Sequence, residues 1–352
     1  MASYGLLALA YLWPQDYRNE SPPYVLVSWL ALLVRVMQFH LGLLLLAIAL
    51  VAAFGRGRRL FLAATPPMLF TLVPAWWAYL PRTRPAGPPP AVRVMTCNLL
   101  MVNRDTAPIV AEIRAARPDV LMLQEYTAEW HEAMLAGGVA REMPYHSFVT
   151  RDDSFGVAVY SRFPFAGDVD NRFPLGRAGV EQTRAAVRVG GRDVAVYNVH
   201  LLPPRRLDYV IDSRLQFAGL LDALASEKLP YVLAGDLNLT GDTPQHRDLL
   251  RAGARDAHDA AGRGRGATWP VNSFLRYLPG IRMDHVYAGN GLMPVTCETG
   301  EGQGSDHRPV IAGVAWAAIA PAAAAGRAPT AAGEPAPPGA PSTAPAGSKR
   351  PQ

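Results

Sequence analysis

The run from Tyr231 to Asn238 constrains this chain more than any other stretch. Four apolar residues, Tyr231 to Ala234, indicate a buried strand that Gly235 interrupts. Asp236 and Asn238 follow, and the alternation of side chains along a strand places both on one side of the chain. A carboxylate beside a carboxamide suits metal-assisted attack on a phosphate, because one group handles the water or metal and the other holds an oxygen. These residues also favour plain turns, so the stretch alone leaves both interpretations open.

The first 80 residues hold most of the apolar surplus. The 352-residue chain is 50% hydrophobic and only 18% charged, which is a low charged fraction for a soluble protein. The apolar runs 36–54 and 60–80 each match the roughly 20 residues of a membrane-spanning helix, and 24–34 is a third, shorter run. We therefore expect residues 1–80 to be a membrane anchor with two or three transmembrane helices, embedded through residues 25–80. The alternative is a signal peptide followed by a core helix.

The arginines beside these runs predict the orientation of the anchor. Arg56, Arg58 and Arg59 lie in the short loop between the two longer runs, and clustered arginines are typical of cytoplasmic loops. The chain after the second run would then face outward, although Arg82 and Arg84 argue against this orientation. We expect a multi-pass protein of the cell membrane with an extracytoplasmic catalytic domain.

The remaining chain divides into a linker, a domain and a tail. Residues 81–90 contain five prolines and should form a stiff spacer. Residues 91–316 alternate strand-like and helix-like runs and include the hairpin signal Gly190-Gly191, a pattern that favours a layered α/β domain. Residues 317–352 are rich in Ala, Pro and Gly without periodicity, so we expect a disordered tail.

Charge and cysteine content narrow the classes of function. Residues 1–90 carry seven basic and two acidic residues and supply the net charge of +5, whereas residues 91–316 carry 24 basic and 26 acidic residues. The central domain therefore has no basic field that would favour a nucleic-acid partner. Cys97 and Cys297 are too few for a disulfide framework. We expect Cys97 to be a buried free thiol, with a single bridge as the alternative.

Polar residues recur at the ends of the strands expected in residues 91–316. We expect strands at 92–97, 120–123, 155–160, 185–189, 194–199, 231–234, 283–287 and 309–315, and helices at 107–116 and 213–226. The polar residues beside the strand ends are Asn98, Glu125, Asn198, His200, Asp236, Asn238, Asp284, Ser305, Asp306 and His307. Each alone has an ordinary explanation, such as a turn cap, a surface acid, a core histidine or a salt bridge. Their recurrence favours one shared site.

In this order, the polar blocks resemble those of the endonuclease/exonuclease/phosphatase superfamily, which includes deoxyribonuclease I, abasic-site endonucleases, inositol polyphosphate 5-phosphatases and neutral sphingomyelinases. The blocks are Cys97-Asn98, Leu123-Gln124-Glu125, Phe155 to Ser161, Asn198-Val199-His200, Gly235-Asp236-Leu237-Asn238, Met283-Asp284-His285 and Ser305-Asp306-His307. The resemblance implies an α/β (α+β) four-layer sandwich of two packed mixed β-sheets flanked by helices. The expected transmembrane helices would precede it.

The resemblance also implies roles around a metal and a water. Mg²⁺, with Mn²⁺ as the alternative, would be bound chiefly by Glu125, with Asn98 and Asp306 on the metal side. Asp236 would orient or deprotonate the attacking water. Asn238 would donate a hydrogen bond to the phosphoryl oxygen and stabilise the charge that develops there.

A second group of roles concerns the phosphate and the leaving group. His307, paired with Asp284, would bind the scissile phosphate or transfer a proton, since a carboxylate fixes the tautomer of an imidazole and raises its pKa. His200 occupies the position at which the phosphodiesterase branches of the superfamily carry a histidine. Abasic-site endonucleases differ at this position, so the sequence fits that branch less well. Asp153 is a candidate to orient His200. Arg184 and Asn198 are expected to contact the substrate.

The function implied by the resemblance is Mg²⁺-dependent hydrolysis of phosphodiester bonds by in-line attack of water. A nucleic acid is the favoured substrate. The alternatives are a phospholipid or sphingomyelin-type diester, or a phosphomonoester. A catalytically silent, membrane-tethered binding domain is the non-enzymatic alternative, and the sequence indicates no protein partner.

Overall fold

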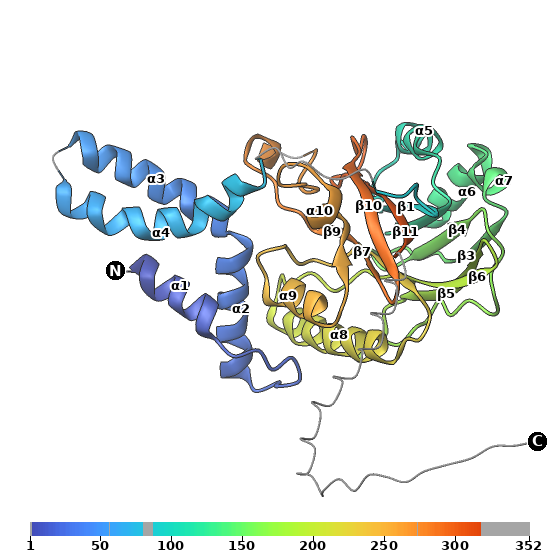
Figure 1. Cartoon of the computed structure of the whole chain (residues 1–352), viewed down its shortest axis with the longest axis horizontal. Helices are drawn as coiled ribbons and strands as arrows, with labels where there is room; N and C mark the ends of the chain where they lie inside the picture. Colours follow the sequence, from blue (N-terminus) through green and yellow to red (C-terminus); the bar gives the residue numbers. More distant parts are fainter. Residues whose placement is uncertain (1, 56, 80–86, 273, 318–352) are drawn as a thin grey trace, which may run out of the picture. The chain divides into compact units, whose positions relative to one another are not determined.

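The computed structural model describes residues 2–55, 57–79, 87–272 and 274–317 (Figure 1). Most of the expected linker at 81–90 and nearly all of the expected tail at 317–352 lie outside these residues, so both remain predictions. Two β-sheets occupy the centre of the region from Val92 to Trp316, with helices on their outer faces (Figure 1).

The first sheet has the strand order β10-β11-β1-β2-β4-β3. Its strands are β1 (Val92–Asn98), β2 (Val120–Gln124), β3 (Tyr145–Val149), β4 (Val157–Ser161), β10 (Leu292–Thr299) and β11 (Val310–Trp316). β1 and β2 run parallel and the other neighbours antiparallel, so the sheet is mixed. We did not expect the two edge strands β3 and β10, because their partly exposed residues form no continuous apolar run.

The second sheet has the order β5-β6-β7-β9-β8. Its strands are β5 (Thr183–Val189), β6 (Arg192–Asn198), β7 (Tyr231–Asp236), β8 (Arg255–Asp256) and β9 (Asp284–Gly289). Only β6 and β7 run parallel. The expected hairpin at Gly190-Gly191 is confirmed, because β5 and β6 pair on either side of it.

The two sheets pack face to face through alternate residues of their strands. Val92 and Val94 of β1 lie in the same buried cluster as Val232 and Ala234 of β7. The residues between them face outward and join separate clusters under the helices. This arrangement gives the four layers of the expected sandwich, which is confirmed. Both cysteines are free, and Cys97 is buried as expected.

Helices cover the outer faces of both sheets. They are α5 (Ala107–Ala116), α6 (Ala128–Ala136), α7 (Val139–Glu142), α8 (Leu207–Ser226) and α9 (Pro244–Arg251). The short helix α10 (Ala257–Ala261) instead contacts β10 of the first sheet and β9 of the second, and a 3₁₀ turn, η1 (Phe274–Tyr277), follows it in the chain. The expected bounds of α5 are correct, but α8 begins at Leu207 rather than at Ser213. Its first turns carry polar residues around the buried Val210, and this mixture hid the helical pattern.

Four helices precede the sandwich: α1 (Ala2–Leu12), α2 (Pro22–Val36), α3 (Gln38–Phe54) and α4 (Arg58–Trp77). The helix α3 begins at Gln38, two residues after the start of the expected span 36–54, because the chain bends by 65° between α2 and α3. Among the described residues, no single helix is both long and apolar enough to cross a membrane, and α2 and α3 meet that requirement only as a bent pair. The expected single-helix spans are therefore not supported.

Candidate active site

The register of the strands brings Asn98 and Asp236 together between the sheets. Asn98 ends β1 and Asp236 ends β7, and each lies an even number of residues from the inward-facing Val94 and Val232. Asn98 Nδ2 donates to Asp236 Oδ2 at 3.1 Å and to Glu125 Oε1 at 3.0 Å. Its Oδ1 accepts from a backbone N–H at 3.1 Å. Asn98 therefore turns its amide nitrogen toward two carboxylates and orders both.

Asp236 Oδ2 lies between two histidines. His200 Nε2 is 3.6 Å from this oxygen, and His307 Nε2 is 3.7 Å from it. His307 Nδ1 in turn lies 2.8 Å from Oδ2 of Asp284, which stands opposite Asp236 in the β7–β9 pairing. All four side chains are buried. One carboxylate oxygen thus faces two imidazoles, one of which has a second carboxylate behind it.

The buried charges hold His307 in its cationic form. Burial alone lowers the pKa of His307, but the carboxylates of Asp284 and Asp236 outweigh it and raise the pKa to about 10. Burial raises the pKa of Asp284, and the imidazolium of His307 opposes that rise. At neutral pH the imidazolium of His307 is therefore paired with the carboxylate of Asp284. It places a fixed positive charge beside Asp236.

Backbone geometry at the end of β7 fixes Asn238. Gly235 has φ +144°, and a Cβ there would lie 1.8 Å from the carbonyl oxygen of Val199, so only glycine fits. Asn238 has φ +49°, its N–H donates to Asp236 Oδ1 at 3.0 Å, and its Nδ2 donates to the carbonyl oxygen of Leu201 at 2.8 Å. A second N–H of the same amide remains for a ligand, so the expected contact with phosphate stays a prediction.

The comparisons with known proteins agree with this geometry. The model of the Endonuclease/Exonuclease/phosphatase family matches residues 95–307, which is more than half of the chain. The chain belongs to this family. It is thus a metal-dependent hydrolase of phosphoric ester bonds.

Solved structures of family members share the fold. An endonuclease/exonuclease/phosphatase from Beutenbergia cavernae DSM 12333 is 24% identical with a TM-score of 0.52, covering 64% of this chain and 72% of that chain. A family protein from Leptotrichia buccalis C-1013-b is 15% identical with a TM-score of 0.52, covering 64% and 100%. TDP2 from D. rerio, solved with a single-strand DNA product, is 14% identical with a TM-score of 0.50, covering 64% and 98%. No curated protein matches the sequence.

Two carboxylates fit the divalent metal that this family requires. Each oxygen of Glu125 accepts one hydrogen bond, from Asn98 Nδ2 at 3.0 Å and from the N–H of Met101 at 2.9 Å, and keeps a lone pair. Asp306 Oδ2 accepts from Trp269 Nε1 at 3.2 Å, whereas its buried Oδ1 has no hydrogen-bond partner within the described ranges. Oxygen donors of this kind suit Mg²⁺. Asp236, Asp284 and His307 lie close enough together to hold an ion.

The two residues expected to contact the substrate, Asn198 and Arg184, have other partners in the structure. Asn198 lies opposite Ala234, one pleat deeper than Asp236, and its amide is used by Gln124 at 2.6 Å and by the carbonyl of Leu123 at 2.9 Å. It joins the two sheets, because its oxygen accepts from Gln124 and its nitrogen donates to carbonyls of β2 and β4. Arg184 stands opposite Tyr197, whose ring faces α8, and its guanidinium binds Glu227 at 2.6 Å. Arg184 therefore lies on the outer face of the sheet, away from the site between the sheets.

Two residues to which the sequence assigned no role, Ser305 and Gln182, order this site. Ser305 Oγ donates to the carbonyl of Asn98 at 2.8 Å and accepts from the N–H of His307 at 3.0 Å, so it ties β1 to the His307 loop. Gln182 binds the main chain of His200. Ser305 had a signal, since it belongs to the Ser305-Asp306-His307 block. Gln182 had none.

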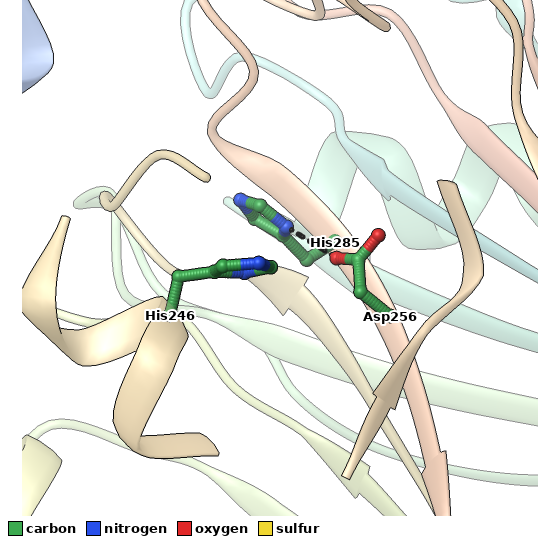
Figure 2. Close-up of side chains that lie close together, drawn as sticks. All are labelled: His246, Asp256 and His285. Carbon is green, nitrogen blue, oxygen red and sulfur yellow. Dashed lines mark hydrogen bonds and ion pairs between the residues drawn. The ribbon is translucent and has the colours of Figure 1, made fainter. Parts of the chain in front are cut away.

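A second cluster of ionisable groups, formed by His246, Asp256 and His285, is not part of this site (Figure 2). Nδ1 of His285 lies 3.0 Å from Asp256 Oδ2, and its Nε2 lies 3.1 Å from a backbone carbonyl. His246 contacts Tyr287 at 2.8 Å and Asp259 at 3.0 Å. Because Arg282 also binds Asp256 at 2.6 Å, the cluster is a closed hydrogen-bond network rather than a cation site.

Proposed function

We propose that this protein is a membrane-associated, Mg²⁺-dependent phosphodiesterase that uses in-line attack by water. One observation carries the proposal. Asp236 Oδ2 faces Asn98 Nδ2 at 3.1 Å, His200 Nε2 at 3.6 Å and His307 Nε2 at 3.7 Å. A carboxylate in this position can take a proton from water, and the imidazoles beside it can meet the charge and the leaving group of a phosphate ester.

We assign each step of the proposed reaction to one of the residues of the site. Asp236 accepts a proton from the water, whose oxygen bonds to phosphorus. The bond between phosphorus and the leaving oxygen breaks, and His200 gives that oxygen a proton. His307, kept cationic by Asp284, and the amide of Asn238 stabilise the charge on the phosphoryl oxygens.

Glu125 and Asp306 are the proposed metal ligands, and Asn98 orders Glu125 for this purpose. When bound, Mg²⁺ neutralises charge on the phosphoryl oxygens and so favours attack. Mn²⁺ should substitute, because it also accepts oxygen ligands. A titration of the full chain with Mg²⁺ tests this part. Binding in the millimolar range that Glu125→Gln abolishes is expected, and absence of binding would favour a silent binding domain.

The favoured substrate is a nucleic-acid phosphodiester. TDP2 from D. rerio, which has the same fold, was solved with a single-strand DNA product. A phospholipid or sphingomyelin-type diester is the second candidate. It is favoured by the exposed large apolar side chains, since 19 of the 26 in the described residues lie between Tyr4 and Tyr79. Apolar surface of that kind is typical of contact with a bilayer.

We also propose that residues 25–80 attach the protein to the cell membrane and that the hydrolase domain is extracytoplasmic. The apolar surface supports the attachment, and so does the bent pair α2 and α3. The arginines at 58 and 59 support the orientation. Protease added to cells with a permeable outer layer should digest residues 91–316. Protection of that region would reverse the orientation.

The substrate class is tested with the full chain in detergent. Bis-p-nitrophenyl phosphate, p-nitrophenyl phosphate, plasmid DNA and sphingomyelin vesicles are each assayed with Mg²⁺ and with EDTA. Hydrolysis of the first diester and of DNA, abolished by EDTA, is the expected result. Activity on sphingomyelin alone would move the substrate to lipid, and activity on the monoester alone would contradict a phosphodiesterase.

A further inference from the structure

Gln182 binds both main-chain groups of His200. Its side chain is fully buried just before β5. Oε1 accepts from the N–H of His200 at 2.7 Å, and Nε2 donates to the carbonyl oxygen of His200 at 2.8 Å. A carboxamide presents one acceptor and one donor in nearly the geometry of a peptide group. Gln182 therefore supplies with its side chain the pairing that a neighbouring strand would supply with its backbone.

These two hydrogen bonds, which we call the Gln182 clamp, complete the backbone hydrogen bonding of the segment that follows β6. Along a strand, successive backbone groups point to opposite neighbours. Val199 and Leu201 donate toward β7, to the carbonyls of Ala234 at 3.0 Å and Asp236 at 3.1 Å. The N–H and C=O of His200 point the other way, toward β5. The pairing with β5 does not extend to His200, because β5 begins at Thr183, opposite Asn198. Without Gln182 these two buried groups would be unpaired, which costs about 1–3 kcal/mol for each group.

The imidazole of His200 depends on this backbone position, because its polar neighbour among the described residues is Asp236, whose Oδ2 lies 3.6 Å from Nε2, beyond hydrogen-bond distance. Its Nδ1 is buried without a hydrogen-bond partner in the part of the chain that the structure describes. The expected partner Asp153 instead binds Arg151 at 2.6 Å and the N–H of Phe155 at 3.0 Å. The ring of Phe155 lies 5.8 Å from the ring of His200 and limits its tilt. The distance from His200 Nε2 to Asp236 is thus set by the main chain.

We infer that Gln182 is a positioning residue that holds His200 at the leaving group. This inference rests on the proposed role of His200. Only a side chain that both donates and accepts at this length keeps the clamp. Methionine is similar in length but does neither, whereas an ionised glutamate can accept from the N–H but repels the carbonyl.

The test is a double-mutant cycle on bis-p-nitrophenyl phosphate with full-length protein and Mg²⁺. Gln182→Met should lower kcat by about 100-fold, the loss associated with a misplacement of roughly 1 Å, and leave KM unchanged. His200→Ala should lower kcat by at least as much. Adding Gln182→Met to His200→Ala should cause no further loss, because the positioned group is already gone. An equal loss in both backgrounds would overturn the inference.

The pH dependence of kcat in the variant Gln182→Glu gives a second test, because a purely structural role of Gln182 would not produce it. A protonated carboxyl group can donate to the carbonyl and accept from the N–H, as the amide does. The ratio of kcat for Gln182→Glu to kcat for the wild type should therefore rise as the pH falls, whereas the ratio for Gln182→Met should stay flat. A flat ratio for both variants would contradict the clamp.

Gln216 offers a matched control. It is also a fully buried glutamine, and its Oε1 accepts from the N–H of Leu202 at 2.9 Å. Gln216→Met should lower thermal stability and leave kcat unchanged. If it lowers kcat as much as Gln182→Met does, the loss reflects general loosening and the inference fails. If His200→Ala itself has no effect, the proposed role of His200 fails instead.

Discussion

At the scale of single residues, the proton on His307 depends on Asp284. The two side chains are buried and lie 2.8 Å apart. The resemblance to the endonuclease/exonuclease/phosphatase superfamily implied this pair, and the structure brings the two side chains together. The neighbouring carboxylate of Asp236 could not be assigned to the same imidazole from sequence, since it requires the register of β7 with β9.

Replacing Asp284 by Asn should lower the pKa of His307 and lower kcat by about 10²- to 10⁴-fold, the usual contribution of a positioned acid–base group. An amide keeps the shape but removes the charge that favours the imidazolium. The measurement is kcat at pH 8 together with the NMR titration of His307. Asp259→Asn is a matched control, because it removes the carboxylate partner of His246 outside the site, and kcat should be unchanged. An Asp284→Asn variant with full activity would contradict the role of Asp284 in keeping His307 protonated.

At the scale of elements, the two sheets are joined by polar groups beneath the site. Gln124 of β2 donates to Asn198 of β6 at 2.6 Å. The sequence placed Asn98, Asn198 and Asp236 beside the ends of strands. It could not show that Asn198 lies one pleat deeper than Asp236, because that depth follows from the pairing of Asn198 with Ala234. For the same reason, the sequence could not show that Arg184 lies opposite Tyr197 on the outer face of the sheet.

Asn198→Leu should reduce the free energy of unfolding by about 1–3 kcal/mol or more, because Gln124 and two buried carbonyl groups lose a partner. The KM should not change. Urea denaturation and steady-state kinetics measure the two quantities. A raised KM with unchanged stability would restore the original expectation that Asn198 contacts the substrate.

The β8–β9 region should make stability depend on pH in the acid range. Burial alone raises the pKa of Asp256, but Arg282 and His285 outweigh it and hold the pKa well below its usual range. The stabilising contribution is therefore present above the unfolded pKa of about 3.9 and is lost as the pH falls further toward the folded value.

Arg282→Met should lower the free energy of unfolding at pH 7 by about 3–5 kcal/mol, because it leaves the buried carboxylate of Asp256 without its closest charge. The difference from the wild type should shrink as the pH falls into the acid range, where Asp256 takes up a proton in the variant before it does so in the wild type. Urea unfolding across this pH range measures it. A deficit that is the same at every pH would show that the loss comes from packing alone.

At the scale of the whole molecule, most of the exposed large apolar side chains of the described residues lie in the first 79 positions, away in sequence from the site residues. Leu50, Val51 and Phe54 at the end of α3 are 50%, 72% and 88% exposed. Composition alone predicted an apolar anchor. It could not predict the bend of 65° between α2 and α3, because composition carries no information on the angle at which consecutive helices meet.

Replacing Leu50, Val51 and Phe54 by Ser should weaken flotation of the full chain with lipid vesicles, since burying apolar surface drives membrane contact. The matched control replaces Leu135, Tyr145 and Leu250, which are exposed on the hydrolase domain, and should float as the wild type does. Equal flotation of all three proteins would contradict attachment through these residues.

The most direct test of the account is the kcat of Asp236→Ala on bis-p-nitrophenyl phosphate with Mg²⁺, measured beside the wild type. Asp236 contacts Asn98 and faces both histidines, so its loss should lower kcat by about 10³-fold or more while the thermal unfolding transition remains cooperative. A folded Asp236→Ala variant with wild-type kcat would show that the reaction takes place elsewhere.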